Sequence, residues 1–227
     1  MLKNRLNALY KNITQLESQF GRLPHSVHLL AISKTQSIES IRQVWENGQI
    51  AFGENYLQEA LPKIAALHDI HIEWHFIGPI QANKTRLIAE NFSWVQSIER
   101  LKIAERLNTQ RPSHLPPLNV CIQVNISQES SKSGIIPEEV ISLAKAIQSL
   151  PQLKLRGLMA IPEPLTDFQQ QRKAFHQLHR LFTELNKTLS LSLDTLSMGM
   201  SQDYAAAIAE GSTMIRIGTA LFGERIR

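Results

Sequence analysis

The chain has 227 residues, 43% of them hydrophobic and 19% charged, and its ten glycines and ten prolines are far too few for a low-complexity chain. A chain of this length buries about 70–75% of the surface that it exposes when unfolded, which excludes a small scaffold that depends on disulfides or metals. The formal net charge is +4, and the basic residues are scattered singly, so the charge suits a small anionic ligand better than a nucleic-acid surface.

Cysteine usage and the amino terminus indicate the compartment. Cys121 is the single cysteine, which excludes an internal disulfide and a cysteine-rich zinc site. It lies in the apolar run from Asn119 to Ile126, so we expect a buried structural thiol rather than a nucleophile. The amino terminus has no continuous apolar segment, and no stretch approaches about 18 apolar residues. We therefore expect a cytoplasmic protein with no membrane segment.

In chain order, the pattern is one helix followed by an alternation of strands and helices. The first helix ends before Gly21 and Pro24, and its apolar stripe consists of Leu2, Leu6, Leu9, Ile13 and Leu16. Eight runs rich in β-forming residues follow, at 27–33, 50–53, 71–78, 93–98, 118–126, 153–161, 193–199 and 214–218. Helical patterns lie between many of them, at 38–46, 56–67, 101–107, 138–150 and 168–185.

This alternation predicts an α/β fold, and eight parallel strands are the number that closes a (β/α)8 TIM barrel. We expect a single barrel domain over residues 1–227 with an extra amino-terminal helix. An open doubly wound sheet is the alternative, but it normally has a glycine-rich turn after its first strand, where this chain has Ser33-Lys34-Thr35. The proline-rich segment 111–117 joins a helix to a strand, and we expect no chemistry there.

A TIM barrel places its active site at the carboxyl ends of its strands, so the residues at those ends are the candidates. They are Lys34, Glu54, Asn55, Gly78, Asn125, Met159, the run Met198-Gly199-Met200-Ser201, Arg216, Gly218 and Thr219. The set holds no Asp/Glu pair and no Ser/His/Asp combination. It therefore argues against hydrolytic chemistry.

Lys34 has the same side-chain parity as Leu30 and Ile32, so a lysine ends an otherwise apolar strand face. A free lysine with a pKa of about 10.4 is protonated at neutral pH, but partial burial lowers the pKa and makes the amine a nucleophile. Imine chemistry requires such an amine. A solvated lysine at a strand end is the alternative if this residue is considered alone.

The ends of the seventh and eighth strands are typical of a phosphate site. Barrels often bind phosphate there through backbone N–H groups and the start of a short helix. Gly199, Ser201, Gly218 and Thr219 supply close backbone approach and hydroxyl donors, although ordinary strand-to-helix turns would also explain the glycines. Arg216 faces the barrel with Gly218, and a buried arginine requires an acceptor. Lysine, phosphate cradle and arginine together resemble a pyridoxal 5′-phosphate site.

Several longer motifs carry a family resemblance. They are LLAISK, FGENYLQE, HFIGPIQANK, SKSG, LRGLMAIP, LSMGMSQDYAAAI and GSTMIRIGTALFG, and they extend from about residue 29 to residue 223. These motifs are similar to those of the pyridoxal phosphate homeostasis proteins, the YggS/PROSC group. The resemblance implies a barrel similar to the amino-terminal domain of alanine racemase.

The resemblance also assigns roles to individual residues. It implies that Lys34 holds pyridoxal phosphate as an imine and that Arg216 contacts the pyridine nitrogen. It further implies phosphate contacts from Ser201, Gly218 and Thr219. The set of cofactor-binding candidates is completed by Met200 in the same turn and by Asn55 in a supporting role.

Two other groups of residues are candidate sites. His71, Glu73 and His75 alternate along one strand face, but their spacing is not that of a helical HExxH zinc motif. We expect a polar row inside the barrel, with His75 nearest the mouth, and no metal site. Lys132 lies in the loop after the fifth strand and is by default a solvated lysine. A weaker hypothesis makes it a second acceptor for the aldehyde during cofactor release.

The resemblance to alanine racemase raises the question of catalysis, which the fold alone does not answer. A two-base racemase takes its second acid/base from an additional domain of the partner subunit, and this chain, ending at Arg227, leaves no room for one. An arginine on the ring nitrogen also weakens the electron sink of the cofactor. We therefore expect a monomer that is not an enzyme, holds pyridoxal phosphate and delivers it to apo-enzymes in vitamin B6 and amino-acid homeostasis. The alternatives are a pyridoxal-phosphate-dependent amino-acid racemase and a cofactor-free lysine-imine aldolase.

Overall fold

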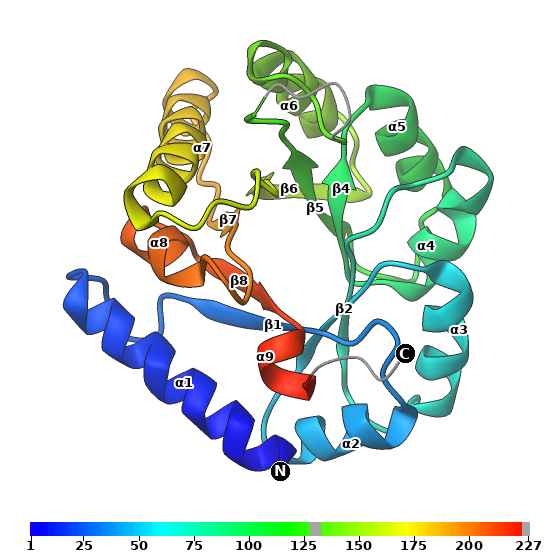
Figure 1. Cartoon of the computed structure of the whole chain (residues 1–227). Helices are drawn as coiled ribbons and strands as arrows, with labels where there is room; N and C mark the ends of the chain where they lie inside the picture. The colour runs from blue at the N-terminus through cyan, green and yellow to red at the C-terminus, as the bar shows by residue number, and fades with distance from the viewer. Residues whose placement is uncertain (128–132, 224–227) are drawn as a thin grey trace.

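The computed structural model describes residues 1–127 and 133–223, and its strands form one closed parallel barrel. The strands follow one another around the barrel in chain order, and β1 closes it by pairing with β8, where Leu30 is opposite Arg216 (Figure 1). Their bounds are β1 (His28–Ile32), β2 (Ala51–Glu54), β3 (Glu73–Phe76), β4 (Trp94–Ile98), β5 (Leu118–Gln123), β6 (Leu153–Met159), β7 (Thr195–Ser197) and β8 (Met214–Ile217). The predicted TIM barrel is confirmed.

The helices form an outer ring around the strands (Figure 1). In the described residues they are α1 (Leu2–Gln19), α2 (Ile38–Glu46), α3 (Leu57–Ala66), α4 (Thr85–Asn91), α5 (Leu101–Gln110), α6 (Val140–Gln148), α7 (Phe168–Thr188), α8 (Tyr204–Ala209) and α9 (Thr219–Phe222). Two 3-10 turns, η1 (Ala82–Lys84) and η2 (Pro137–Glu139), precede α4 and α6. The helical patterns found in the sequence correspond to α1, α2, α3, α5, α6 and α7. No described helix is long and apolar enough to span a bilayer.

The predicted elements differ from the observed ones in two respects, the length of the strands and the number of helices found. Most strands are one to four residues shorter than the predicted runs, because the runs include flanking residues that lie outside the paired strands, as in 71–78 against Glu73–Phe76. The sequence periodicity also missed α4, α8 and α9, which have seven, six and four residues. Helices of so few turns hold too few buried positions to produce a recognisable stripe.

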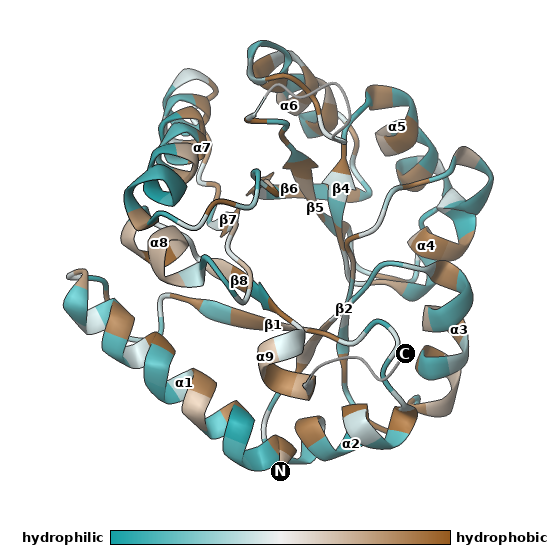
Figure 2. Ribbon diagram, in the orientation of Figure 1, coloured by the Kyte–Doolittle hydropathy of each residue, from teal (hydrophilic) through white to brown (hydrophobic). Residues whose placement is uncertain are grey.

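Alternating side chains divide the barrel into two apolar layers. The large outer layer lies between strands and helices and contains Leu29 and Ala31, and the helices in Figure 2 carry both brown and teal stretches, as helices with one apolar face do. The opposite parity of β1 places Leu30 and Ile32 with Met214 in a small separate cluster inside the barrel. Cys121 lies in a second inner cluster with Trp94 and Met159. Its full burial, which raises the pKa of its thiol to about 12, confirms a structural thiol.

The amino-terminal helix is anchored to the start of the barrel. α1 packs against α2, α8 and α9 through a buried stripe that includes Leu6, Leu9 and Ile13. Its buried Glu17 accepts hydrogen bonds from the backbone N–H groups of His25 and Val27, at 3.1 and 2.9 Å. The carboxylate thereby fixes the segment that leads into β1.

Candidate cofactor site

A cavity of about 480 Å³, here called the mouth cavity, opens at the carboxyl ends of β1, β7 and β8. Its size lies within the range of about 300–1,000 Å³ that is usual for small-molecule sites. Six of the seven predicted cofactor-binding residues line it, namely Lys34, Met200, Ser201, Arg216, Gly218 and Thr219. The seventh, Asn55, is outside the lining. The barrel therefore brings together side chains that lie up to 185 positions apart in the sequence, from Lys34 to Thr219.

The turn that carries Lys34 is held on both sides. Before it, the Ser33 carbonyl accepts a hydrogen bond of 2.8 Å from Lys63 Nζ. After it, Thr35 has a φ of 66°, a left-handed conformation that is strained for a β-branched residue, and its N–H donates to Glu59 Oε2 at 3.0 Å. Lys63 and Glu59 both belong to α3. This helix thus fixes the backbone on each side of the half-buried Lys34.

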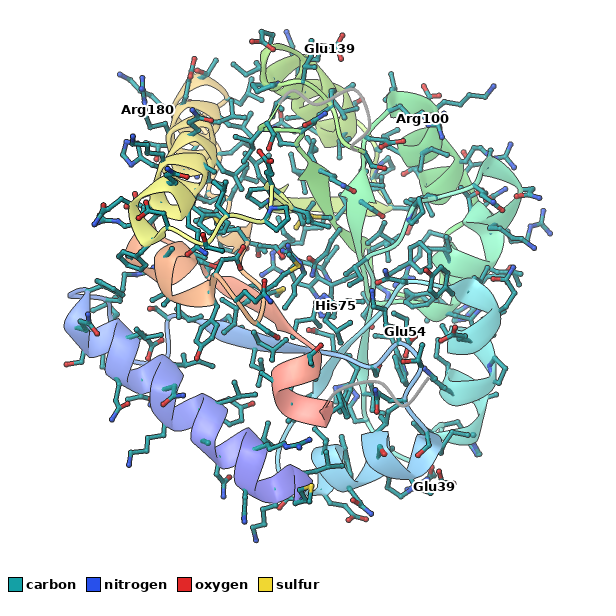
Figure 3. The ribbon with its side chains drawn as sticks, in the orientation of Figure 1. Glu39, Glu54, His75, Arg100, Glu139 and Arg180 are labelled. Atoms are coloured by element: carbon teal, nitrogen blue, oxygen red, sulfur yellow. The ribbon has the colours of Figure 1, made fainter. Side chains whose placement is uncertain are left out.

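Glu54 and Asn55 end β2 but have different surroundings. The Glu54 carboxylate is fully buried on the side of β2 toward α3, where Figure 3 labels it, and not in the mouth cavity. It accepts from Lys63 Nζ at 2.8 Å and from Ser33 Oγ at 2.7 Å. Burial raises the pKa of Glu54, and these two hydrogen bonds oppose the rise. Glu54 is therefore a support of the Lys34 turn, a role that the sequence did not indicate.

The role predicted for Asn55 stays a prediction. Its Oδ1 atom is buried and accepts no hydrogen bond from any described residue. The backbone around it is tightly packed, because a Cβ atom on Gly78 would lie 2.0 Å from the Asn55 carbonyl oxygen. Glycine at position 78 is thus required for β2 and β3 to approach each other here.

Arg216 is 3% exposed and is held by two neutral acceptors. Its Nη1 donates to Ser197 Oγ at 2.8 Å, and its Nη2 donates to the Ala160 carbonyl at 2.9 Å. The predicted need for acceptors is therefore met. Burial lowers the pKa of Arg216 to about 10, so the guanidinium stays charged at neutral pH. Arg216 is a fixed cation in the wall of the mouth cavity.

The turn after β7 depends on a glycine and an aspartate. Gly199 has a φ of 98°, and a Cβ atom there would lie 2.6 Å from Ala207 Cβ of α8. Asp203 Oδ1 accepts from the Met200 N–H at 2.5 Å, which closes the turn around Ser201. Asp203 also lines the cavity, and burial raises the pKa of its carboxyl. Sequence reasoning missed Asp203, although an aspartate just before a helix is a common turn former.

The turn after β8 leads directly into α9, the short helix that accompanies many phosphate sites in barrels. Gly218 precedes it and Thr219 is its first residue. The first N–H groups of a helix have no intrahelical acceptor, so they are available to an anion in the mouth cavity. Gln36, Pro164 and Leu165 complete parts of the wall and were not indicated by the sequence.

The structure describes the histidine row and the proline-rich loop as structural groups outside the mouth cavity. Glu73 and His75 form the predicted row inside the barrel, joined by a hydrogen bond of 2.8 Å between His75 Nε2 and Glu73 Oε1, whereas His71 is exposed. Within residues 1–127 and 133–223, His, Cys, Asp and Glu side chains form no cluster suited to a metal ion. Lys132 lies outside the described residues. Arg111, in the loop 111–117, donates to the backbone carbonyls of Ala89 and Phe92.

The barrel and its mouth define a class of proteins. Residues 5–226 match the family model of the alanine racemase N-terminal domain. Structures of alanine racemase itself share only the fold: one from Clostridium difficile is 13% identical with a TM-score of 0.74, over 99% of this chain and 58% of the racemase.

Within that class, more similar proteins narrow the assignment. The pyridoxal phosphate homeostasis protein of Pasteurella multocida is 54% identical, over 99% of this chain and 97% of its own length, and that of Pseudomonas aeruginosa is 60% identical, over 90% and 87%. The structure of PipY from Synechococcus elongatus with pyridoxal phosphate bound is 36% identical, with a TM-score of 0.85 over 98% of this chain and 100% of PipY. The chain belongs to the family of pyridoxal phosphate homeostasis proteins.

Proposed function

We propose that the protein binds pyridoxal 5′-phosphate in the mouth cavity and acts in vitamin B6 and amino-acid homeostasis. The observation that carries this proposal is the convergence of a lysine amine, a buried guanidinium and the turns after β7 and β8 on one cavity of about 480 Å³. The donor set fits the cofactor, which has an aldehyde, an anionic phosphate and a pyridine nitrogen. The PipY structure, which contains the same cofactor, supports the assignment.

Each group has a distinct task in this proposal. Pyridoxal phosphate supplies an aldehyde that a lysine amine attacks, and Lys34 is the lysine in the cavity wall. Ser201 and Thr219 donate hydroxyl hydrogen bonds to the phosphate, and the backbone at Gly218 approaches it closely. Arg216, as a permanent donor, faces the pyridine nitrogen. An arginine at that position keeps the nitrogen unprotonated and weakens the cofactor as an electron sink.

We further propose that the protein stores and delivers the cofactor without catalytic turnover. Its relatives of high identity are named as homeostasis proteins and not as enzymes, whereas alanine racemase shares only the fold. In this proposal the protein is a monomer in the cytoplasm, and apo-enzymes that require pyridoxal phosphate receive the cofactor from it.

The Lys34→Ala variant tests the binding site. Purified wild-type protein with pyridoxal phosphate is expected to show a visible absorption band, and Lys34→Ala to lose it because the covalent attachment is gone. Lys145→Ala, which removes an exposed lysine on α6, is the control and should keep the band. Borohydride reduction followed by peptide mapping should place the phosphopyridoxyl mass on the Lys34 peptide. A label found only on another lysine would contradict the assignment.

A further inference from the structure

A continuous chain of hydrogen bonds crosses the inside of the barrel and ends on Arg216. Arg216 Nη1 donates to Ser197 Oγ at 2.8 Å, and Ser197 Oγ donates to Gln96 Oε1 at 2.7 Å. Gln96 Nε2 lies 2.9 Å from His75 Nδ1, and His75 Nε2 lies 2.8 Å from Glu73 Oε1. Residues from β8, β7, β4 and β3 thus form one line, called here the trans-barrel chain.

The trans-barrel chain runs in one direction. The guanidinium can only donate and the amide nitrogen of Gln96 can only donate, so His75 Nδ1 must accept. The proton of the neutral imidazole is then on Nε2, which donates to the Glu73 carboxylate. Every bond therefore points from the cation Arg216 toward the anion Glu73. Such an ordered series of dipoles strengthens each of its bonds in a medium of low polarity.

Burial isolates the middle of the trans-barrel chain and leaves its two ends in different cavities. Ser197, Gln96 and His75 are all 0% exposed, and His75 lies inside the ring of strands in Figure 3, stacked on Trp94 with ring centroids 5.0 Å apart. Arg216 lines the mouth cavity. Glu73 instead lines a separate cavity of about 570 Å³ at the amino-terminal end of the barrel, and its side chain is 40% exposed.

The orientation of the Arg216 guanidinium depends on this arrangement. Among the described residues no carboxylate lies within ion-pair distance of its guanidinium, and its two acceptors are neutral. A buried cation with neutral acceptors is stabilised by the dipoles that point at it. The hydroxyl of Ser197 can present its lone pairs to Arg216 because its own proton is committed to Gln96. Gln96 is in turn oriented by His75 and Glu73.

We propose that Ser197, Gln96, His75 and Glu73 are positioning residues of the cofactor site, which hold the Arg216 guanidinium as a donor to the pyridine nitrogen of pyridoxal phosphate. The inference rests on the proposed function for its ligand. It extends the site through the whole barrel, because a carboxylate at the amino-terminal end acts on the cofactor at the carboxyl end. The effect of substituting a residue on cofactor affinity decreases with its distance from Arg216 along the trans-barrel chain.

The test combines affinity with a spectroscopic signal from the ring nitrogen. Pyridoxal phosphate labelled with 15N in the ring is bound to wild-type protein, Ser197→Ala, Gln96→Leu and Glu73→Gln, and its dissociation constant and 15N chemical shift are measured. Ser197→Ala should weaken affinity about fivefold, as expected for the loss of one hydrogen bond, and move the ring resonance. Glu73→Gln keeps an acceptor for His75 but removes the charge, so it should weaken affinity about twofold and move the resonance less.

Ser212→Ala is the matched control, because Ser212 is equally buried near the same strands but donates to the Met198 carbonyl and not to the trans-barrel chain. It should leave affinity and resonance unchanged. An unchanged ring resonance in both Ser197→Ala and Glu73→Gln would overturn the inference. If Ser197→Ala does not fold, the isosteric Glu73→Gln decides alone. In protein without cofactor, the side-chain N–H resonance of Arg216 should shift in the chain variants, which separates failure of the chain from failure of cofactor binding.

Discussion

Burial determines what individual side chains do inside this barrel. Arg216 and His75 are both almost fully enclosed, and burial lowers the pKa of each. For Arg216 a pKa of about 10 still means a charged group at neutral pH, whereas His75, whose pKa falls below its usual 6.5, stays neutral. One residue is thus a permanent cation in the mouth cavity. The other is a neutral link whose Nδ1 can accept.

The neutral state of His75 predicts a pH dependence of stability. Burial and the nearby Arg156 lower the pKa of His75, and the hydrogen bond to Glu73 opposes them. Below about pH 6.5 the unfolded chain binds a proton at this residue that the folded protein does not, so the free energy of unfolding falls as the pH falls. Between pH 7.5 and 5.5, protonation of His75 in the unfolded chain accounts for a loss of at most about 1.4 kcal/mol.

Urea unfolding of wild-type protein and His75→Gln at the two pH values measures this difference. The loss on acidification should be smaller in His75→Gln, because the titrating group is absent. An equal loss in both proteins would mean that His75 is protonated in the folded state.

The phosphate contacts proposed for Ser201 and Thr219 predict a second effect at single residues. Replacing both hydroxyls, in Ser201→Ala with Thr219→Ala, removes two donors to an anionic group, each worth about 1.5–3 kcal/mol. The affinity for pyridoxal phosphate should therefore fall at least about tenfold while the fold is retained. Equilibrium dialysis measures the affinity, and circular dichroism checks the fold. Unchanged affinity in the double variant would move the phosphate site away from the turns after β7 and β8.

At the scale of elements, the junctions between strands and helices position the site. The Lys34 turn is held by α3, which supplies Glu59 and Lys63, and the turn after β7 lies against α8. No residue of α3 or α8 lines the mouth cavity. Each helix contacts a backbone turn on the side away from the cavity. The side chains of that turn that point into the cavity therefore need little rearrangement when a ligand binds.

Gly199 allows the contribution of one junction to be measured. Gly199→Ala should destabilise the fold and weaken cofactor affinity, because the added Cβ atom would lie 2.6 Å from Ala207 Cβ and displace the Met200–Ser201 turn. Gly48→Ala is the matched control: Gly48 has a nearly identical φ of 97°, but a Cβ atom there would meet nothing within 4 Å. Both variants carry the cost of a left-handed alanine, about 1–2 kcal/mol. Thermal melts and cofactor titration should show the larger loss for Gly199→Ala, and equal effects would exclude the contact with α8.

At the scale of the whole molecule, the residues that line the mouth cavity determine which acid–base chemistry it can support. The titratable side chains among the described lining of the mouth cavity are Lys34, Asp203 and Arg216. The Asp203 carboxylate accepts a hydrogen bond from the Met200 N–H, and the Arg216 guanidinium is a cation that donates to Ser197. A racemase needs a second acid/base opposite its lysine, and the loss of such a group typically costs about 10²–10⁴ in rate.

We therefore expect no substantial racemase, transaminase or decarboxylase turnover. The loaded protein is incubated with individual L-amino acids in deuterated water, and α-proton exchange and chirality are followed by NMR and chiral chromatography. Slow exchange without substrate preference is the expected result. Rapid and selective racemisation that is lost in Lys34→Ala would establish the racemase alternative.

The sequence by itself determined the architecture and the main members of the candidate site. The number of β-rich runs predicted the barrel, and parity placed Lys34 on the same strand face as Leu30 and Ile32, because side chains alternate along a strand. The barrel then assigned Lys34, Arg216 and the glycine turns to one end, since all parallel strands end on the same side. These inferences need only local periodicity and the direction of the chain.

Only the tertiary structure decided which residues are partners. Adjacent residues Glu54 and Asn55 have different surroundings, and the outward Glu54 is matched by Lys63 from the following helix. Ser197 and Gln96 are 101 residues apart in sequence but are hydrogen-bonded across the barrel. Such pairs form because closure of the sheet and burial force polar atoms to find acceptors among whatever side chains the facing strands present. No pattern in the sequence shows which residues of two facing strands will lie opposite each other across the barrel.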